Sequence, residues 1–191
     1  MFKGSLQSKR LLLRPLVPED DALLYRYVTE NREWLKPWEP ARTPYYYTQE
    51  AQRRLLFQME ESWENGTGCV LGVFELGRLD ELLGRVSVFG IVRGVWQNAF
   101  VGYSIAQSHS GKGYMTEALK RTVHYCFFDL DLHRVQLSIL PRNLGSLRVA
   151  QKCAFRNEGL AVRYMEVNQV WEDHQILALT QEEVNQQYFN S

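Results

Sequence analysis

The sequence predicts an α/β fold in which a sheet of mixed strand direction is flanked by helices. Strand-like and helix-like segments follow one another in the order β-α-α-β-β-β-α-β-α-β-β. Three successive strands joined by glycine-containing turns favour an antiparallel meander. The strand–helix–strand unit that follows, at 98–140, favours a right-handed connection between two parallel strands. We therefore expect a mostly antiparallel sheet with one parallel pair.

The first half of the chain predicts one strand, two helices and an aromatic segment between the helices. A strand at 9–16 ends at two prolines, and two aspartates then open an apolar-periodic helix that continues to about residue 32. Residues 34–47 hold three prolines and five aromatic residues, which is typical of an irregular and often functional loop. A second helix at 48–64 ends before Asn65-Gly66.

The second half predicts strands at 69–76, 82–92, 98–106, 133–140, 155–167 and 170–180, and helices at 114–128 and 143–153. The helix at 114–128 has the strongest pattern, because its apolar residues recur every three or four positions. They are Met115, Ala118, Leu119, Thr122, Val123, Cys126 and Phe127. This stripe is typical of core packing.

Composition indicates a single domain, 1–191, whose 45% hydrophobic content can fill a sizeable core. We expect a cytoplasmic protein, since apolar runs are too short to span a bilayer and the N-terminus lacks a secretory signal. The three cysteines are widely spaced, which suits reduced thiols. Two of them lie on predicted buried helix faces, which argues against a cysteine nucleophile. The four histidines lack the spacing of metal ligands, so no metal site is predicted.

The net charge is zero, but it is unevenly distributed. Residues 110–156 hold eight Lys or Arg against three acids, a net charge of +5. Residues 157–191 hold six acids against one Arg, a net charge of −5. A local basic surface on a neutral protein indicates a small anionic ligand more than bulk nucleic acid, and solvated helix charge explains the pattern equally well.

A glycine-rich turn separates the strand at 98–106 from the strongest helix. Its sequence is Ser110-Gly111-Lys112-Gly113-Tyr114-Met115. Glycines let backbone N–H groups face one point, and a helix N-terminus adds about half a positive charge, so the turn suits a pyrophosphate. The P-loop is excluded because Gly113 stands where that motif needs Ser or Thr, and the dinucleotide fingerprint because Thr116 stands where it needs glycine.

These residues resemble the GNAT superfamily of N-acetyltransferases, and within it the Rim-type ribosomal-protein-alanine N-acetyltransferases. Three stretches carry the resemblance: the glycine-rich turn at 110–115, the turn Pro141-Arg142-Asn143-Leu144-Gly145-Ser146, and the segment 31–40. The chain departs from the family pattern at Ser110, which replaces Arg or Gln, and at Met115, which replaces a small residue. The family implies that the parallel central strands splay apart, and that acetyl-CoA is the cosubstrate.

The resemblance also implies which residues hold coenzyme A. Backbone amides would bind its pantetheine and pyrophosphate, and the amide of Ile105 would polarise the thioester carbonyl as an oxyanion donor. Asn143 would contact the pantetheine arm, and Arg148 is a candidate for the ribose phosphate on the basis of charge. The cofactor-binding candidates are Ile105, Gly111, Lys112, Gly113, Tyr114, Met115, Asn143 and Arg148.

Three residues are candidates for catalysis. The family's turn implies that Ser146 donates a hydrogen bond to the leaving sulfur, although a serine there also suits a helix start. Glu39 in the aromatic segment and Glu166 on a late strand are candidate bases, although a solvated surface acid is the favoured interpretation for each of them taken alone. The position at which the Rim-type family has a catalytic glutamate corresponds to Met165 in this chain.

The resemblance implies that the acceptor is an amine. An α-amine has a pKa of about 7.7–8.0 and a lysine about 10.4, so a protein N-terminus asks less of a base. The leading hypothesis is direct acetyl transfer to a protein N-terminal α-amine, without nucleic acid or membrane partners, by a monomer or homodimer. The alternatives are a small-molecule amine acetyltransferase acting on a polyamine, antibiotic or amino acid, and a non-catalytic coenzyme A-binding module.

Overall fold

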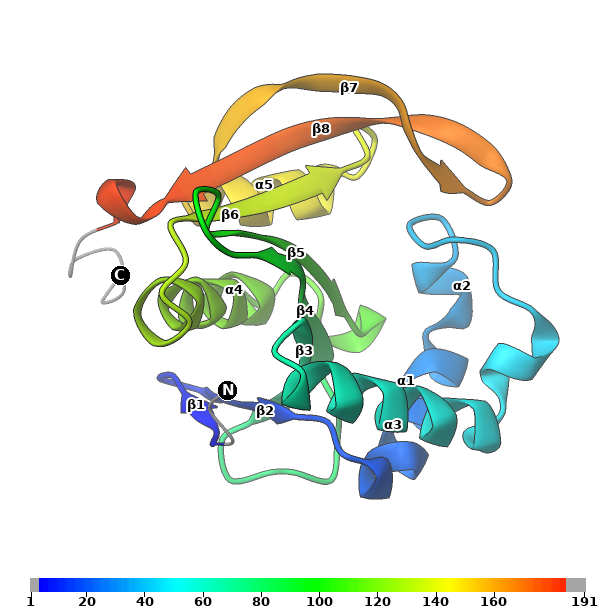
Figure 1. The fold of residues 1–191 in the computed structure, drawn as a ribbon. Coiled ribbons are helices and arrows are strands. Elements are labelled where there is room, and N and C mark those ends of the chain that lie inside the picture. The colour runs from blue at the N-terminus through cyan, green and yellow to red at the C-terminus, as the bar shows by residue number, and fades with distance from the viewer. Residues whose placement is uncertain (1–3, 185–191) are drawn as a thin grey trace.

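The computed structural model describes residues 4–184, which form one eight-stranded sheet with helices on both faces (Figure 1). The strand order is β1-β2-β3-β4-β5-β6-β8-β7. Only β5 and β6 are parallel, and every other neighbouring pair is antiparallel. The strands are β1 Leu6–Gln7, β2 Leu11–Pro15, β3 Gly68–Glu75, β4 Gly84–Val92, β5 Asn98–Ile105, β6 Arg134–Ile139, β7 Arg156–Val167 and β8 Val170–Thr180. The predicted mixed sheet with one parallel pair is confirmed.

The helices divide between the two faces of the sheet. They are α1 Asp21–Glu30, α2 Arg32–Leu35, α3 Gln49–Glu64, α4 Tyr114–His124 and α5 Leu144–Lys152. A larger buried cluster joins α4 and α5 to one face, and a smaller cluster joins α1 and α3 to the other. Figure 1 shows α4 and α1 on opposite sides of the central strands.

The structure refines three predicted elements. The two-residue β1 was not predicted because so short a strand has no detectable periodicity. The aromatic segment contains the helix α2 and a 3-10 turn, η2 Pro44–Tyr47. The helix predicted at 114–128 is α-helical only to His124 and continues as a π-helical turn, η4 Tyr125–Asp129. Tyr125, Cys126 and Phe127 are all buried, and three consecutive buried residues do not fit one stripe of an α-helix.

The basic and acidic segments of the sequence meet in the fold. Glu158 accepts hydrogen bonds from Arg134 at 2.6 Å and from Arg156 at 2.8 Å. The hydrogen bond from Arg134 is the main reason why the pKa of Glu158 falls to about 2. Arg142 pairs with Glu172 in the same way. Three of the eight basic residues in 110–156 are therefore paired with acids of the C-terminal segment.

No helix within residues 4–184 combines the length and apolar character needed to cross a membrane.

Candidate active site

The parallel strands β5 and β6 separate after a short stretch of pairing. They pair from Asn98↔Arg134 to Phe100↔Gln136, whereas β5 continues to Ile105. The N–H of Ala106 donates to Leu83 at 2.8 Å, on the β4 side. Because successive N–H groups of a strand point to opposite edges, the Ile105 N–H points to the edge that β6 has left. An acyl oxygen placed in this opening would meet that donor.

The glycine-rich turn lies at the start of α4. Gly111 and Gly113 have φ angles of 75° and 81°, in the left-handed region that glycine adopts without strain. The first helical bond runs from the Glu117 N–H to the Gly113 carbonyl, so the amides of residues 114–116 precede it and lack helical acceptors. A Cβ built on Gly111 meets no atom within 4 Å, so the space there is open. These features fit a pyrophosphate.

Arg10, which sequence reasoning missed, braces this turn from β2's side of the sheet. Its Nη1 donates to the Lys112 carbonyl at 3.2 Å, and its Nε donates to Glu117 at 2.7 Å. Its guanidinium also lies 4.6 Å from the centre of the Tyr114 ring. Glu117 accepts further hydrogen bonds from the Arg10 backbone and from Ser8. The partners are more than a hundred positions apart, so no local pattern could indicate them.

Met115 fits the helix start without crowding it. Its side chain is buried in the core, so its backbone amide is the group that could bind a ligand at the turn. Its Cε lies 3.3 Å from the position of a Cβ built on Gly84, and that Cβ would be 2.4 Å from the Ser104 carbonyl oxygen. Gly84 therefore allows β4 to approach the end of β5 closely.

Asn143 and Ser146 occupy the first turn of α5. The Asn143 Oδ1 accepts from the Ser146 N–H at 3.1 Å, so Asn143 is the residue that caps this helix. The Tyr103 hydroxyl donates to the Ser146 carbonyl at 2.9 Å and so links β5 to α5 where β5 and β6 diverge. Burial raises the pKa of Tyr103, which keeps this hydroxyl protonated as a donor. Arg148 is exposed on the same helix.

A polar network lies on the opposite face of β5. Ala99, Val101, Tyr103 and Ile105 face the α4 side, whereas Ser104 faces α1. The Ser104 hydroxyl accepts from Tyr27 at 2.8 Å and from Arg85 at 3.4 Å, and Arg85 also donates to Glu39 at 2.8 Å. Sequence reasoning found Glu39 but none of its partners.

Charge and burial keep the Arg85 side chain charged and the Tyr27 hydroxyl protonated. Burial alone would lower the pKa of Arg85, but the nearby Tyr46, Glu39 and Tyr27 raise it above its ordinary value. Burial raises the pKa of Tyr27 to about 12, so its hydroxyl remains a donor. Glu39 thus faces a permanent positive charge, and its ion pair with Arg85 holds its side chain in position.

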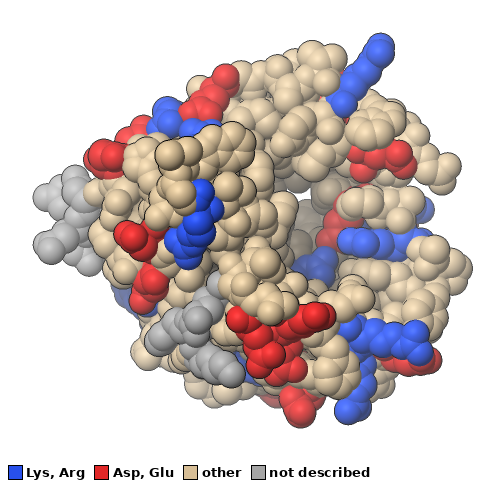
Figure 2. Space-filling model, in the orientation of Figure 1, with Lys and Arg blue, Asp and Glu red and all other residues tan. Residues whose placement is uncertain are grey.

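The aromatic segment lies beside the network. The Trp34 indole donates to the Ile105 carbonyl at 3.0 Å, so this segment contacts the end of β5 directly. Arg142 lies 5.4 Å from the Trp38 ring centre and donates to the Pro37 carbonyl, so it also contacts this segment. Figure 2 shows a deep hollow between the part that carries β7 and β8 and the part that carries α1 and α2, with acidic and basic side chains in its wall.

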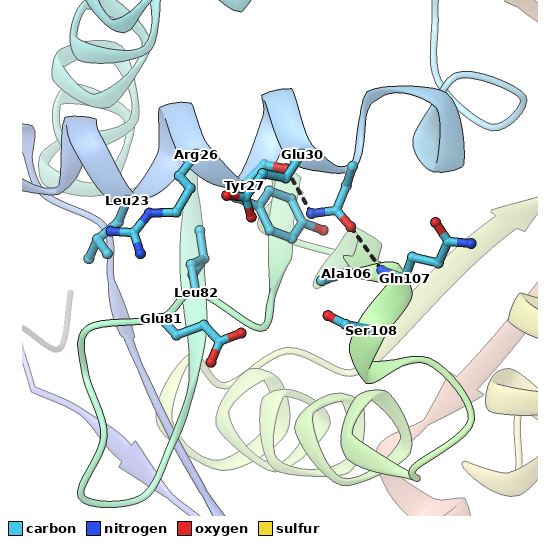
Figure 3. Close-up of a pocket in the computed structure, with 10 residues that line it drawn as sticks. Leu23, Arg26, Tyr27, Glu30, Glu81, Leu82, Ala106, Gln107 and Ser108 are labelled. Atoms are coloured by element: carbon cyan, nitrogen blue, oxygen red, sulfur yellow. Dashed lines mark hydrogen bonds between the residues drawn. The ribbon is translucent and has the colours of Figure 1, made fainter.

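A pocket of about 420 Å³ lies under α1 (Figure 3). Tyr27 and Asn31 line it, together with Glu30, Glu81 and Gln107. Asn31 accepts a hydrogen bond from the Gln107 N–H at 2.8 Å, which ties α1 to the chain just before the glycine-rich turn. This bond holds α1 in a fixed position relative to the glycine-rich turn.

Other candidates lie apart from this site. Glu166 is exposed on β7, and its neighbour Val167 is the buried residue, so Glu166 points away from the packed face. All three cysteines are buried, and burial raises the pKa of Cys69 and of Cys153 to about 12, which leaves thiols rather than thiolates. Over residues 4–184, no three His, Cys, Asp or Glu side chains form a metal-binding group.

The splayed parallel strands, with a glycine-rich turn at the helix start that follows, define the class of an acyltransferase fold. Residues 10–156 match the Acetyltransferase (GNAT) domain, and this chain belongs to the GNAT acetyltransferase family. Its relatives and structural neighbours include ribosomal-protein N-acetyltransferases of the Rim type.

Two sequence relatives extend over nearly the whole chain. The probable N-acetyltransferase YjcK of Bacillus subtilis is 41% identical over 174 residues, which are 91% of this chain and 96% of that protein. The ribosomal protein uS5-alanine N-acetyltransferase of Escherichia coli is 32% identical over 178 residues, covering 93% of this chain and 91% of that protein.

Two solved structures share the fold at similar coverage. The ribosomal-protein-S5-alanine acetyltransferase of Vibrio fischeri is 28% identical with a TM-score of 0.88, covering 95% of this chain and 99% of that one. RimJ of Mycobacterium smegmatis, in complex with CoA-disulfide, is 28% identical with a TM-score of 0.90, covering 98% and 90%. The predicted family and enzyme class are confirmed.

Proposed function

We propose that this acetyltransferase uses acetyl-CoA to acetylate the N-terminal α-amine of a protein by direct transfer. One observation carries the proposal: the Ile105 amide lies between the glycine-rich turn on the α4 side of β5 and the Glu39–Arg85–Ser104 network on the α1 side. Donor and acceptor would approach from opposite faces of the sheet and meet at the strand opening. The names of the Rim-type relatives support a ribosomal protein as the acceptor.

On the donor side, the amides of Gly111, Gly113, Tyr114 and Met115 would hold the pyrophosphate, with Lys112 at the exposed edge of the turn. Acetyl-CoA supplies the acetyl group already activated as a thioester. The Ile105 N–H would stabilise the negative charge that develops on the acyl oxygen. Ser146, at the start of α5, would donate a hydrogen bond to the departing sulfur.

On the acceptor side, Glu39 would orient the incoming amine, and the amine proton would pass to water. This division suits an α-amine, of which about a tenth is already free base near neutral pH. A lysine side chain would need a much stronger base, and Glu39 is already paired with Arg85. We therefore favour an N-terminus over a lysine side chain.

The test is thiol release from acetyl-CoA with three groups of acceptors. We expect turnover with peptides that have a free N-terminal Ala or Ser, and none with N-blocked peptides that contain lysine. Preference for polyamines or free amino acids would replace this proposal with small-molecule acetylation. Binding of acetyl-CoA without turnover of any acceptor would support a non-catalytic module.

A further inference from the structure

A second pocket, of about 110 Å³, opens beside the acceptor network. The helix α2 and the segment 39–47 provide most of its lining, and Asn168 closes it from the turn between β7 and β8. The residues that matter for its charge are Arg32, Lys36, Glu39 and Arg42. Because Glu39 also contacts Arg85, and Arg85 contacts Ser104 next to Ile105, two side chains link the pocket lining to the proposed reaction centre.

The pocket has an excess of positive charge. Glu39 is its one acid and is already paired with Arg85, and Lys36 lies 3.8 Å from Glu33. Among the described residues, neither Arg32 nor Arg42 forms an ion pair. Two guanidinium groups without a carboxylate partner in one small pocket favour an anion from outside the chain.

Aromatic rings hold the two guanidinium groups in place. Arg32 lies 4.4 Å from the centre of the Tyr47 ring, and Arg42 lies 4.6 Å from that of Tyr46. The two rings contact each other edge to face at 5.1 Å. A guanidinium over a ring keeps its N–H groups for hydrogen bonds, and the contact reduces the entropy that an anion must offset to be bound.

We propose that Arg32 and Arg42 form an anion subsite that binds the carboxylate side chain of an acidic residue close behind the acetylated N-terminus. The inference rests on the proposed function and adds a sequence preference to it. The phosphates of coenzyme A are not the intended occupants, because the glycine-rich turn that suits them lies with α4, on the other face of β5. The size of the pocket suits a carboxylate and not a nucleotide.

The test compares hexapeptide amides with an N-terminal Ala and a single Glu at the second, third or fourth residue, each against its Gln counterpart. The C-terminal amide ensures that only the side chain supplies a carboxylate. At about 50 mM salt we expect the best Glu peptide to exceed its Gln counterpart about fivefold in kcat/KM, and the ratio to approach one at about 0.5 M. This measurement needs no variant.

Variants then assign the effect to the pocket. Arg42→Gln and Arg32→Gln should each reduce the Glu-to-Gln ratio, and Arg42→Glu should shift the preference to a Lys peptide. The matched control is Arg54→Gln, because Arg54 also lies over a ring of the same turn, 5.9 Å from Tyr45, but pairs with Glu50 outside the pocket. Arg54→Gln should keep the native ratio. A loss of folding would lower the turnover of the Glu and Gln peptides by the same factor and leave their ratio unchanged.

A ratio of one at all three positions at low salt would overturn the subsite while leaving N-terminal acetylation intact. A ratio that survives Arg32→Gln and Arg42→Gln in folded protein would also overturn it. If every peptide is inert, the proposed function itself fails, and this result is distinct from equal turnover.

Discussion

The first turn of α5 allows the structural and catalytic roles of two neighbouring residues to be separated. The cap is the 3.1 Å hydrogen bond from the Ser146 N–H to the Asn143 side chain, so it depends on the Asn143 side chain and only on the backbone of Ser146. Asn143→Ala should therefore lower the free energy of unfolding by about 1 kcal/mol. Ser146→Ala keeps the cap and should change stability by less than about 0.5 kcal/mol.

The catalytic role is tested by the activity of the Ser146→Ala variant, whose stability should be nearly unchanged. If the Ser146 hydroxyl assists the leaving sulfur, Ser146→Ala lowers kcat while acetyl-CoA affinity stays near the native value. The assays are urea denaturation, calorimetry with acetyl-CoA, and thiol release, all on one preparation of each variant. The reasoning is refuted if Ser146→Ala loses stability as Asn143→Ala does while kcat of the folded protein is unchanged.

Three further predictions concern the turn, the acceptor network and the sheet edge. Gly113→Val should weaken acetyl-CoA binding at least tenfold, because a β-branched residue at φ 81° costs about 1–2 kcal/mol and the turn must change shape to relieve this strain; unchanged affinity by calorimetry in folded protein would contradict this. Glu39→Gln should raise the acceptor KM and lower the free energy of unfolding by about 1 kcal/mol, because it leaves the partly buried Arg85 without its ion pair; normal acetyl-CoA binding is the control. The ion pairs of Glu158 lower its pKa to about 2 in the folded protein, from about 4.3 in the unfolded chain. Their contribution to stability should therefore be complete above about pH 4.3 and should be lost as the pH falls through about 2. The free energies of unfolding of the native protein and of Glu158→Gln, measured against pH, should converge at about pH 2.

The elements that could be predicted are those with a local physical cause. The apolar stripe of α4, the alternation of the strands and the glycines before a helix each depend on residues a few positions apart. Gly111 and Gly113 do adopt the left-handed conformation that their positions in the turn implied. The parallel pair followed from the rule that a strand, a helix and a strand form a crossover.

The relations between distant segments could not be predicted in the same way. Three contacts join residues between 43 and 102 positions apart: Arg10 with Lys112, Arg85 with Glu39, and Tyr103 with Ser146. A single sequence contains no periodic signal for such contacts, because they form only when the strands take their order in the sheet. The charge excess at 110–156 suggested a basic surface because the acids that pair with Arg134 and Arg142, namely Glu158 and Glu172, lie outside that segment of the sequence.

The sequence by itself therefore determined the fold class, the family resemblance and the turn that suits a pyrophosphate, because all three are encoded in local patterns of residues. Only the tertiary structure decided that Glu39 pairs with Arg85, that Asn143 and not Ser146 caps α5, and that two arginines in one pocket lack a carboxylate partner within residues 4–184. Burial and charge pairing depend on which side chains meet in space, and that is a property of the folded chain as a whole.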